Sequence, residues 1–566
     1  MGDYPTAATI PSESSGLLHG LVVRTTVLEG GKLMCHNPQA VLRKQVINRT
    51  FISTIIFVSF ISGCSTFGPV TQTGCRKREN LDPKIEAAID GFRASVPDKM
   101  SKGKIPGVAI ALVDNDGIIW AEGFGYTDLK RKIPATPDTP FHIGSISKTF
   151  TATAVLLAVQ DGLLNLDESI TMYLPNFKVY SRYEEHPEQK ITLRRLLSHT
   201  AGIPHETVGC NMLEITDSFE DRVRSLYETW LKCPVGQGYS YSGAGYDVAA
   251  YVLQKVSGIP FEQYIKERIL DPLGMANSTL NQKDIRNNTN RAIGHTIGIA
   301  EHPSAHGLLG AGGVFTSAAD LARFAQLLMN EGIYEGKCLL DESLIDVMLT
   351  PNAVVNTPED EIQLSYGMGI VFSRLRLGKE EIDTRGHTGA GGGYFTHFEW
   401  YPEYGTGTVV LTNRVPHSAL YDLAIGRRLL EKGLVAKSTP VSSWDCAHCV
   451  PKWTAWPKHN PSPYKPQWKK YCGKFMLRLS GYKLKWWAKL ALFLDLDQYT
   501  PRIKVFEKDG YLYLTESKLM ASITHDWQVE QKLQETKPGL FFTASGSTLD
   551  FRGEIPTWRN YRLRKR

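Results

Sequence analysis

The stretch FHIGSISKTF at residues 141–150, followed by TATAVLLAV at residues 151–159, indicates the fold and the chemistry most directly. The apolar and small residues run nearly all round a helix, which predicts a helix buried in the centre of a domain. Ser145 and Lys148 are three residues apart at its start, so they share one helix face. A serine beside a buried amine, at a helix N-terminus that favours negative charge, suits acyl transfer through a serine ester.

The Ser-x-x-Lys spacing alone is not specific, because a chain of 566 residues contains about one or two such spacings by chance. An ordinary serine and lysine in the first turn of a helix is therefore the competing interpretation. Two further stretches favour the catalytic one, namely YSYSGAGY at residues 239–246 and RGHTGAGGG at residues 385–393.

In this order, the three stretches resemble the motifs of the serine β-lactamase and penicillin-binding-protein superfamily. The resemblance is closest to class C β-lactamases and to their esterase and D-aminopeptidase cousins, in which a tyrosine leads the second motif. It extends over about residues 85–430. Connecting segments are also similar to family blocks: LLSHTAGIP at 196–204, DPLGM at 271–275, GGVFTSAADLARF at 312–324 and YGMGI at 366–370.

The fold class that we expect is α/β in the α+β sense: a β-lactamase/transpeptidase-like antiparallel sheet flanked by helices, with an inserted helical region, followed by a small all-β domain. Residues 83–100 have helical periodicity, and residues 108–121 read as a hairpin with an Asp-Gly turn. The Ser145 helix should end near Asp161-Gly162. A mostly helical middle continues to about residue 345, and strands return near Tyr366, Gly393 and 408–412. The active site would lie where sheet and helices meet.

The resemblance also implies roles for single residues. Ser145 would be the acylated nucleophile, and Lys148 would help to deprotonate it. Tyr241 matches the family tyrosine that serves as general base, as phenolate or by sharing a proton with the lysine. His387 stands where most β-lactamases have lysine and many esterase-like members have histidine. There it would stabilise the anionic intermediate or relay a proton, since histidine has a pKa suited to both tasks.

By the same analogy, the backbone N–H groups of Ser145 and Ala390 would form the oxyanion hole. Thr388 and Gly389 would contact the substrate. The glycines at 389 and 391–393 would let the strand edge approach the substrate closely.

One departure from the family pattern bears on the substrate. The second motif usually ends in an asparagine whose amide binds the acylamide of a β-lactam or peptide, and this chain has Gly243 instead. A site without that donor does not select for the acylamide group. Together with His387 in place of lysine, this favours hydrolysis of esters or small amides. A β-lactamase or D-Ala-D-Ala-type peptidase, and a catalytically silent scaffold that binds a ligand or a protein, remain the alternatives.

Two assignments in these motifs have alternative interpretations. Tyr239, Tyr241 and Tyr246 are close together, and Tyr241 is preferred for its place relative to Pro234 and Tyr246. His199 is expected to have a structural role, with a hydrogen bond inside the LLSHT turn.

Composition divides the chain into four parts: an N-terminal extension at 1–79, the hydrolase domain at 80–435, a linker at 436–468 and a β-domain at 469–566. The linker contains six prolines. The last part has short strand patterns joined by tight turns, and Asp509-Gly510 is the strongest signal for a hairpin. This part resembles the lipocalin-like domain appended to many superfamily members.

The N-terminal extension indicates export. An apolar run at residues 51–63 follows three basic residues and ends in ISGC, which looks like a bacterial lipobox with Cys64 as the lipidated residue. We expect an exported, membrane-tethered protein, as a lipoprotein or through a single-pass anchor, because residues 51–75 contain no charge. Since about 50 residues precede the run, the translation start is expected to be internal, at Met34 or later.

Charge and cysteines add little to the functional assignment. The chain has a net charge of +6, and residues 451–566 hold 22 Lys+Arg against 10 Asp+Glu, or about +12. This fits an anionic membrane surface or merely a solvated basic domain, and no pattern indicates nucleic acid. Cys210 and Cys233 are candidates for a disulfide, whereas Cys446 and Cys449 read as a local disulfide or two free thiols. No cofactor or metal is expected; the substrate would be a small ester or amide or a peptide-like molecule.

Overall fold

The computed structural model covers the whole chain and describes fourteen segments. The predictions on the export segment, Cys64 and the translation start lie outside the described residues, as do Cys210, Cys446 and Cys449. The described residues are 72–205, 218–295, 299–301, 308–355, 364–377, 380–414, 423–437, 460–477, 483–484, 502–517, 530–543, 548–554, 556–558 and 561–565.

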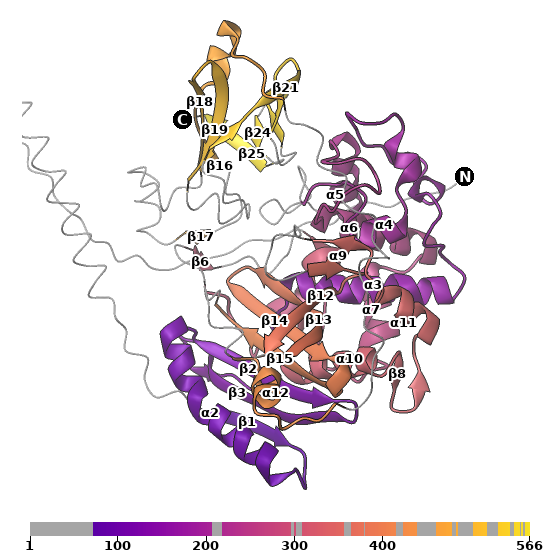
Figure 1. Cartoon of the computed structure of the whole chain (residues 1–566), viewed down its shortest axis with the longest axis vertical. Helices are drawn as coiled ribbons and strands as arrows, with labels where there is room; N and C mark the ends of the chain where they lie inside the picture. The colour runs from indigo at the N-terminus through magenta and orange to yellow at the C-terminus, as the bar shows by residue number, and fades with distance from the viewer. Residues whose placement is uncertain are drawn as a thin grey trace, which may run out of the picture. The chain divides into compact units, whose positions relative to one another are not determined.

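An antiparallel sheet joins the two ends of the hydrolase domain (Figure 1). Its order is β1-β3-β2-β15-β14-β13-β12-β11-β10, with β4 paired to β3. The pairing of β2 with β15 brings residues 108–114 beside 406–412, as the strand pattern at both ends of the domain predicts. The strands are β1 Gln72–Lys77, β2 Gly107–Asp114, β3 Gly117–Asp128, β4 Ile133–Pro134, β10 Ala353–Val354, β11 Leu364–Tyr366, β12 Val371–Leu377, β13 Glu380–Gly391, β14 Tyr394–Tyr401 and β15 Thr406–Thr412.

Both faces of this sheet are covered. Along β2, Val108, Ile110 and Leu112 pack with the helices α2 (Pro83–Gly103) and α12 (Ile425–Glu431). The alternate residues of β2 face the larger core of the helical region. A strand buried on both sides needs apolar residues at every position, which explains the continuous run VAIALV. The predicted β2–β3 hairpin is confirmed, although Asp114 pairs with Gly117, so Asn115 and Asp116 form its loop.

The segment between β5 and β10 holds nine of the α-helices in the described residues. Among the described residues, no helix has both the length and the apolar composition needed to cross a bilayer. The helices are α3 Ser147–Gln160, α4 Leu193–Leu197, α5 Phe219–Arg224, α6 Gly243–Ser257, α7 Phe261–Ile265, α8 Gln282–Asn287, α9 Leu309–Gly312, α10 Ala318–Met329 and α11 Glu342–Met348. Short strand pairs join β5 Phe141–His142 to β7 Phe315–Thr316, β8 Ile333–Tyr334 to β9 Lys337–Cys338, and β6 Ile299–Glu301 to β17 Lys483–Leu484.

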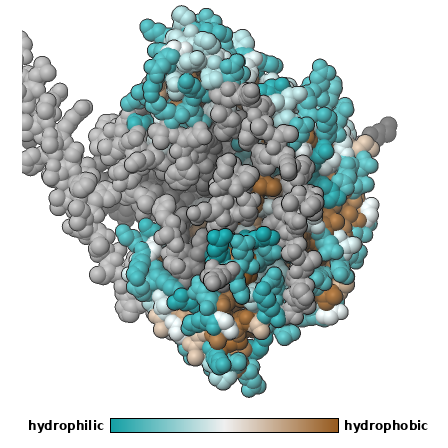
Figure 2. Space-filling view, viewed as in Figure 1, coloured by the Kyte–Doolittle hydropathy of each residue, from teal (hydrophilic) through white to brown (hydrophobic). Residues whose placement is uncertain are grey.

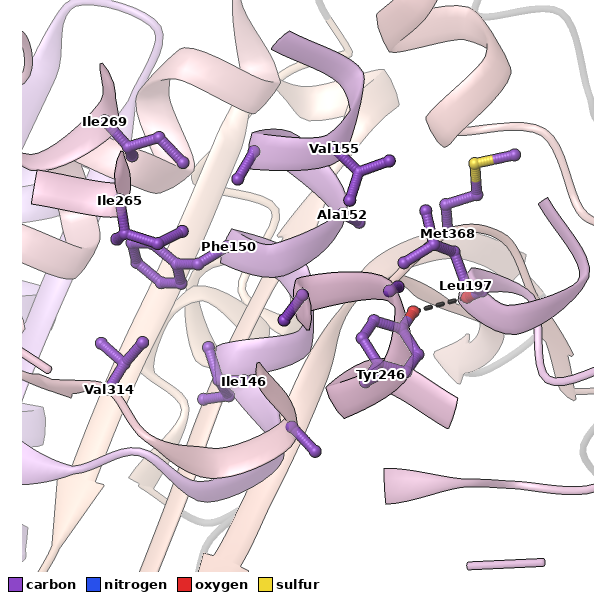
Figure 3. Close-up of a cluster of buried hydrophobic side chains, with 14 of the residues drawn as sticks. Ile146, Phe150, Ala152, Val155, Leu197, Tyr246, Ile265, Ile269, Val314 and Met368 are labelled. Atoms are coloured by element: carbon purple, nitrogen blue, oxygen red, sulfur yellow. Dashed lines mark hydrogen bonds between the residues drawn. The ribbon is translucent and has the colours of Figure 1, made fainter. Parts of the chain in front are cut away.

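Helix α3 is the centre of the core. All of its residues from 147 to 158 are buried, which confirms the helix predicted to be apolar all round. Phe150 stacks on Phe324 of α10, with ring centroids 3.9 Å apart. Figure 3 shows Phe150, Ala152 and Val155 of α3 among side chains from other segments. The helix ends at Gln160 with Asp161 as its C-cap, and Gly162 follows with a φ of 72°, in agreement with the predicted end.

The C-terminal strands form a second antiparallel sheet, in the order β20-β19-β18-β16-β25-β24-β23-β22-β21. It has its own apolar cluster, which includes Trp468, Phe475, Leu512 and Phe541, and the face seen in Figure 2 is largely hydrophilic. The predicted Asp509-Gly510 hairpin is confirmed, with both φ angles positive. The strands are β16 Gly473–Leu477, β18 Arg502–Lys508, β19 Tyr511–Glu516, β20 Gln531–Lys532, β21 Gln534–Lys537, β22 Leu540–Phe542, β23 Thr548–Asp550, β24 Thr557–Trp558 and β25 Tyr561–Lys565.

The lipocalin-like character predicted for this part is not confirmed. A lipocalin is a closed barrel, whereas β20 and β21 are the two outer strands of this order and no pairing joins them in the described residues. The result is a small all-β unit, as expected, without the closure that the resemblance implied.

Candidate active site

The predicted Ser–Lys pair is in contact. Ser145 lies in a 3-10 turn, η1 (Gly144–Ile146), directly before α3, and its side chain is partly exposed. Lys148 is only 2% exposed. Its Nζ donates to Ser145 Oγ over 3.1 Å and to the carbonyl oxygen of Ala311 over 3.1 Å. A buried amine is therefore fixed against the hydroxyl of a serine that solvent can reach.

Asp247 of α6 fixes the carbonyl that orients Lys148. Its carboxylate accepts hydrogen bonds from the backbone N–H groups of Leu309, Gly310 and Ala311, at 3.1, 2.8 and 3.1 Å. Burial raises the pKa of Asp247 to about 6. Asp247 was not among the predicted site residues. The available signal was a carboxylate among the small and apolar residues that begin the helix, four residues after Gly243.

In the second motif, the Tyr241 ring lies closer to Lys148 than the Tyr246 ring does, with centroid distances of 4.8 and 5.6 Å from Nζ. Tyr241 is partly exposed. Tyr246 is fully buried and donates its hydroxyl hydrogen to the carbonyl of Leu197, the contact drawn in Figure 3. Burial raises the pKa of Tyr239 and Tyr246 well above the ordinary value. Tyr246 is therefore a packing residue, whereas Tyr239 has the same intermediate exposure as Tyr241.

His387 lies in β13 and is neutral. Its Nδ1 is 2.6 Å from the carbonyl oxygen of Thr388, which can only accept, so Nδ1 carries the hydrogen. Nε2 then accepts from the hydroxyl of Tyr366 at 3.1 Å. Burial, followed by the charge of Lys148, lowers the pKa of His387 to about 3. This corrects the expectation of a pKa near neutrality, because desolvation disfavours a second cation beside Lys148. Tyr366, in the YGMGI block, was not predicted to contact the site.

The backbones of η1 and β13 touch beside Ser145. A Cβ on Gly144, which has a φ of 50°, would lie 2.8 Å from the backbone nitrogen of Ala390. A Cβ on Gly389 would lie 1.8 Å from the carbonyl oxygen of Ile143. Glycine is therefore required on both sides of the contact. This contact brings together the segments whose N–H groups were predicted to form the oxyanion hole, with Thr388 half-buried beside them.

Gly243 is the first residue of α6, and a side chain there would require its neighbours to shift. A Cβ there would lie 2.8 Å from Leu308 Cδ1 and 3.2 Å from the carbonyl oxygen of His205. The Gly243 N–H donates to that same carbonyl at 2.9 Å. An apolar side chain thus occupies the space into which a side chain at 243 would extend.

His199 has the structural role that was predicted for it. Its backbone N–H donates to the carbonyl of Leu196 at 3.3 Å, inside the LLSHT turn. Its ring Nδ1 also accepts from the backbone N–H of Ser242 at 3.0 Å, a contact between the motifs at 196–204 and 239–246 that was not predicted.

Comparison with known proteins agrees with this geometry. A model of the Beta-lactamase family matches residues 88–431, which is more than half of the 566 residues. The chain belongs to the Beta-lactamase family. Members of this family are in general serine hydrolases.

The curated relatives match only part of the chain. Protein flp of Staphylococcus aureus (strain MW2) is 32% identical over 200 residues, which are 35% of this chain and 39% of flp. PbpX of Bacillus subtilis (strain 168) is 31% identical over 263 residues, which are 46% of this chain and 60% of PbpX. The chain therefore spans less than two thirds of the length of either relative.

Solved structures support the fold. The octameric penicillin-binding protein homologue from Pyrococcus abyssi has a TM-score of 0.53 and 21% identity, covering 84% of this chain and 99% of that one. SurE with D-Leu has a TM-score of 0.51 and 20% identity, covering 85% of this chain and 100% of that one.

The buried histidines make the stability sensitive to acid. Burial lowers the pKa of His142 to about 4, and that of His387 to about 3, from an ordinary value of 6.5. Unfolding lets both rings bind protons below pH 6.5, so their stabilising effect is present above this pH and is lost as the pH falls toward the folded values. Between pH 7.5 and pH 5, we expect each ring to lower the free energy of unfolding by about 2 kcal/mol. Urea titrations at both values measure the change.

Asp247 has the opposite effect on how the free energy of unfolding changes with pH. Its pKa is raised to about 6 from 3.8, so its ionisation destabilises the fold as the pH rises through this range. It offsets about 1 kcal/mol of the loss at pH 5. His142→Gln, which keeps a donor toward the Gly312 carbonyl, should make the pH dependence shallower by about 2 kcal/mol. Equal or greater stability of the unmodified protein at pH 5 would contradict the assignment.

Proposed function

We propose that the protein is a serine hydrolase that acts through an acyl-enzyme on ester or small amide substrates. The observation that carries the proposal is the 3.1 Å hydrogen bond from Lys148 to Ser145, with the same amine 4.8 Å from the centre of the Tyr241 ring. The alcohol, the amine and the phenol come from two distant motifs, and they meet where the serine is open to solvent.

The reaction follows from this arrangement. Ser145 Oγ attacks the substrate carbonyl while its proton passes to the oxygen of Tyr241, which acts as a phenolate paired with the charged Lys148. The N–H groups of Ser145 and Ala390 stabilise the negative charge that develops on the carbonyl oxygen, and such donors contribute about 3–4 kcal/mol each. The leaving alcohol or amine takes the proton. A water molecule, activated by the same pair, then releases the acid and restores Ser145.

Two features favour esters and small amides. His387 is neutral and bonded at both ring nitrogens, so it offers no cation for a substrate carboxylate where most β-lactamases have lysine. Gly243 offers no amide for an acylamide, and Leu308 fills the space beside it. Groups that would bind the two ends of a β-lactam or peptide are thus absent from these positions.

A β-lactamase or D-Ala-D-Ala-type peptidase is the second candidate. It is favoured by the similarity to a penicillin-binding protein homologue and to a structure solved with D-Leu. A catalytically silent binding protein is the third. The three candidates differ in whether Ser145 reacts and with which acyl group.

A covalent probe tests whether Ser145 is a reactive nucleophile. A fluorophosphonate probe should label the full-length protein, because Ser145 is activated and partly exposed. Ser145→Ala should abolish labelling, and Lys148→Met should reduce it at least 100-fold. Ser147→Ala serves as the matched control, because Ser147 is fully buried and bonds to the backbone of Val314. A folded protein that resists the probe would support the silent binding protein.

A panel of substrates tests which acyl compounds are hydrolysed and how Gly243 affects the choice. On a panel of p-nitrophenyl esters, D-amino-acid amides and nitrocefin, the unmodified protein should prefer the esters. Gly243→Asn should lower activity on every substrate without creating nitrocefin hydrolysis, because Leu308 obstructs the new side chain. Rapid turnover of nitrocefin by the unmodified protein, with no ester hydrolysis, would show that the β-lactamase alternative is right.

We further propose that the protein is exported and tethered to a membrane, which rests on the apolar run at 51–63 and on Cys64. The full chain expressed in a bacterium should incorporate labelled palmitate, and Cys64→Ser should not. Membrane association of Cys64→Ser without lipid would identify an uncleaved anchor. Recovery of the unmodified, unlipidated protein in the cytosolic fraction would contradict tethering.

A further inference from the structure

His199 holds the chain on both sides of Tyr241. The backbone N–H of Ser240 donates to the carbonyl oxygen of His199 at 2.8 Å. The backbone N–H of Ser242 donates to Nδ1 of the His199 ring at 3.0 Å. One residue therefore accepts hydrogen bonds from the two amides that flank the phenol.

The serine side chains strengthen this attachment. Ser240 Oγ donates to the carbonyl of Ile203, and Ser242 Oγ donates to the carbonyl of Pro204, both at 2.8 Å. Both serines are 3% exposed, whereas Tyr241 between them is only partly buried. Neighbouring residues of an extended chain point to opposite sides, so anchoring the two serines directs Tyr241 away from them, toward Lys148.

The His199 ring also packs against the phenol. The ring centroids of His199 and Tyr241 are 4.3 Å apart, and His205 stacks on Tyr241 with centroids 5.3 Å apart. His199 has a φ of 62°, a left-handed conformation that costs energy for a residue with a side chain. A strained backbone kept at a buried position, 1% exposed, indicates that the ring is needed where it is.

The hydrogen bond to Ser242 fixes the tautomer of His199. A backbone amide can only donate, so Nδ1 is unprotonated and the ring hydrogen is on Nε2. Nε2 is buried and has no hydrogen-bond partner in the described part of the chain. Burial, followed by the charges of Lys148, His387 and His205, lowers the pKa of His199 well below its ordinary value. The neutral form that keeps Nδ1 as an acceptor is thus the stable one.

We propose that His199 is a positioning residue, which holds the phenol of Tyr241 against Lys148 through the acceptor at Nδ1. The role of Tyr241 rests on the proposed function, but the hold on residues 240–242 does not. His199 acts through Tyr241 and is not assigned a contact with the substrate.

Two polar variants separate the ring nitrogens. Asparagine places its side-chain oxygen near the position of Nδ1 and tolerates the left-handed conformation, whereas glutamine places its polar group near Nε2. In His199→Gln, hydrogen exchange at the Ser242 amide should rise at least tenfold, and fluorophosphonate labelling of Ser145 should slow about 100-fold. In His199→Asn, both should stay within tenfold of the unmodified protein. Tyr246→Phe is the control, because it removes another bond between the motifs at 196–204 and 239–246 and leaves the Ser242 acceptor in place.

The outcomes decide separately on the two proposals. Unchanged exchange and labelling in His199→Gln would overturn the positioning role, and so would equal impairment of His199→Asn and His199→Gln. If His199→Gln does not fold, His199→Asn still decides, because it must keep slow exchange and fast labelling. If the unmodified protein is not labelled at all, the proposed function fails, while the exchange at Ser242 still tests the hold of His199.

Discussion

The site depends on one buried amine. Lys148 is almost fully enclosed, and an enclosed ammonium needs acceptors and neighbours that tolerate its charge. Ser145 and the Ala311 carbonyl supply the acceptors, and the faces of Tyr241 and Tyr246 lie within 4.8 and 5.6 Å of Nζ. The neutral state of His387 follows from the same charge. The chemistry of the site is thus organised around what this amine requires.

The position of the amine depends in turn on the fold. Helix α3 is buried from Ser147 to Ala158, and Figure 3 shows Phe150, Ala152 and Val155 of this helix among side chains of other segments. The carbonyl that orients Lys148 belongs to α9, which Asp247 of α6 holds by three backbone hydrogen bonds. Helix α6 also begins directly after Tyr241 and Ser242. One helix therefore positions two of the groups that surround the amine.

The sequence predicts much of this, because local patterns record local structure. The apolar run after Ser145 predicts α3 and its burial, and the Asp509-Gly510 pair predicts a tight hairpin. Contacts between distant segments are harder to predict from the sequence. The bond of Tyr366 to His387, and that of His199 to Ser242, join residues whose approach depends on how whole elements pack. The charge state of His387 could not be predicted either, because it follows from burial and not from residue type.

The contact between Gly144 and Ala390 has a consequence for how this site can change. Both partners approach through their main chains, and no side chain lies between them. Because main-chain atoms make this contact, substitutions of the surrounding side chains need not displace it. Under the proposed function, residues that line the site can therefore change the accepted acyl group while the backbone N–H groups of Ser145 and Ala390 keep their places.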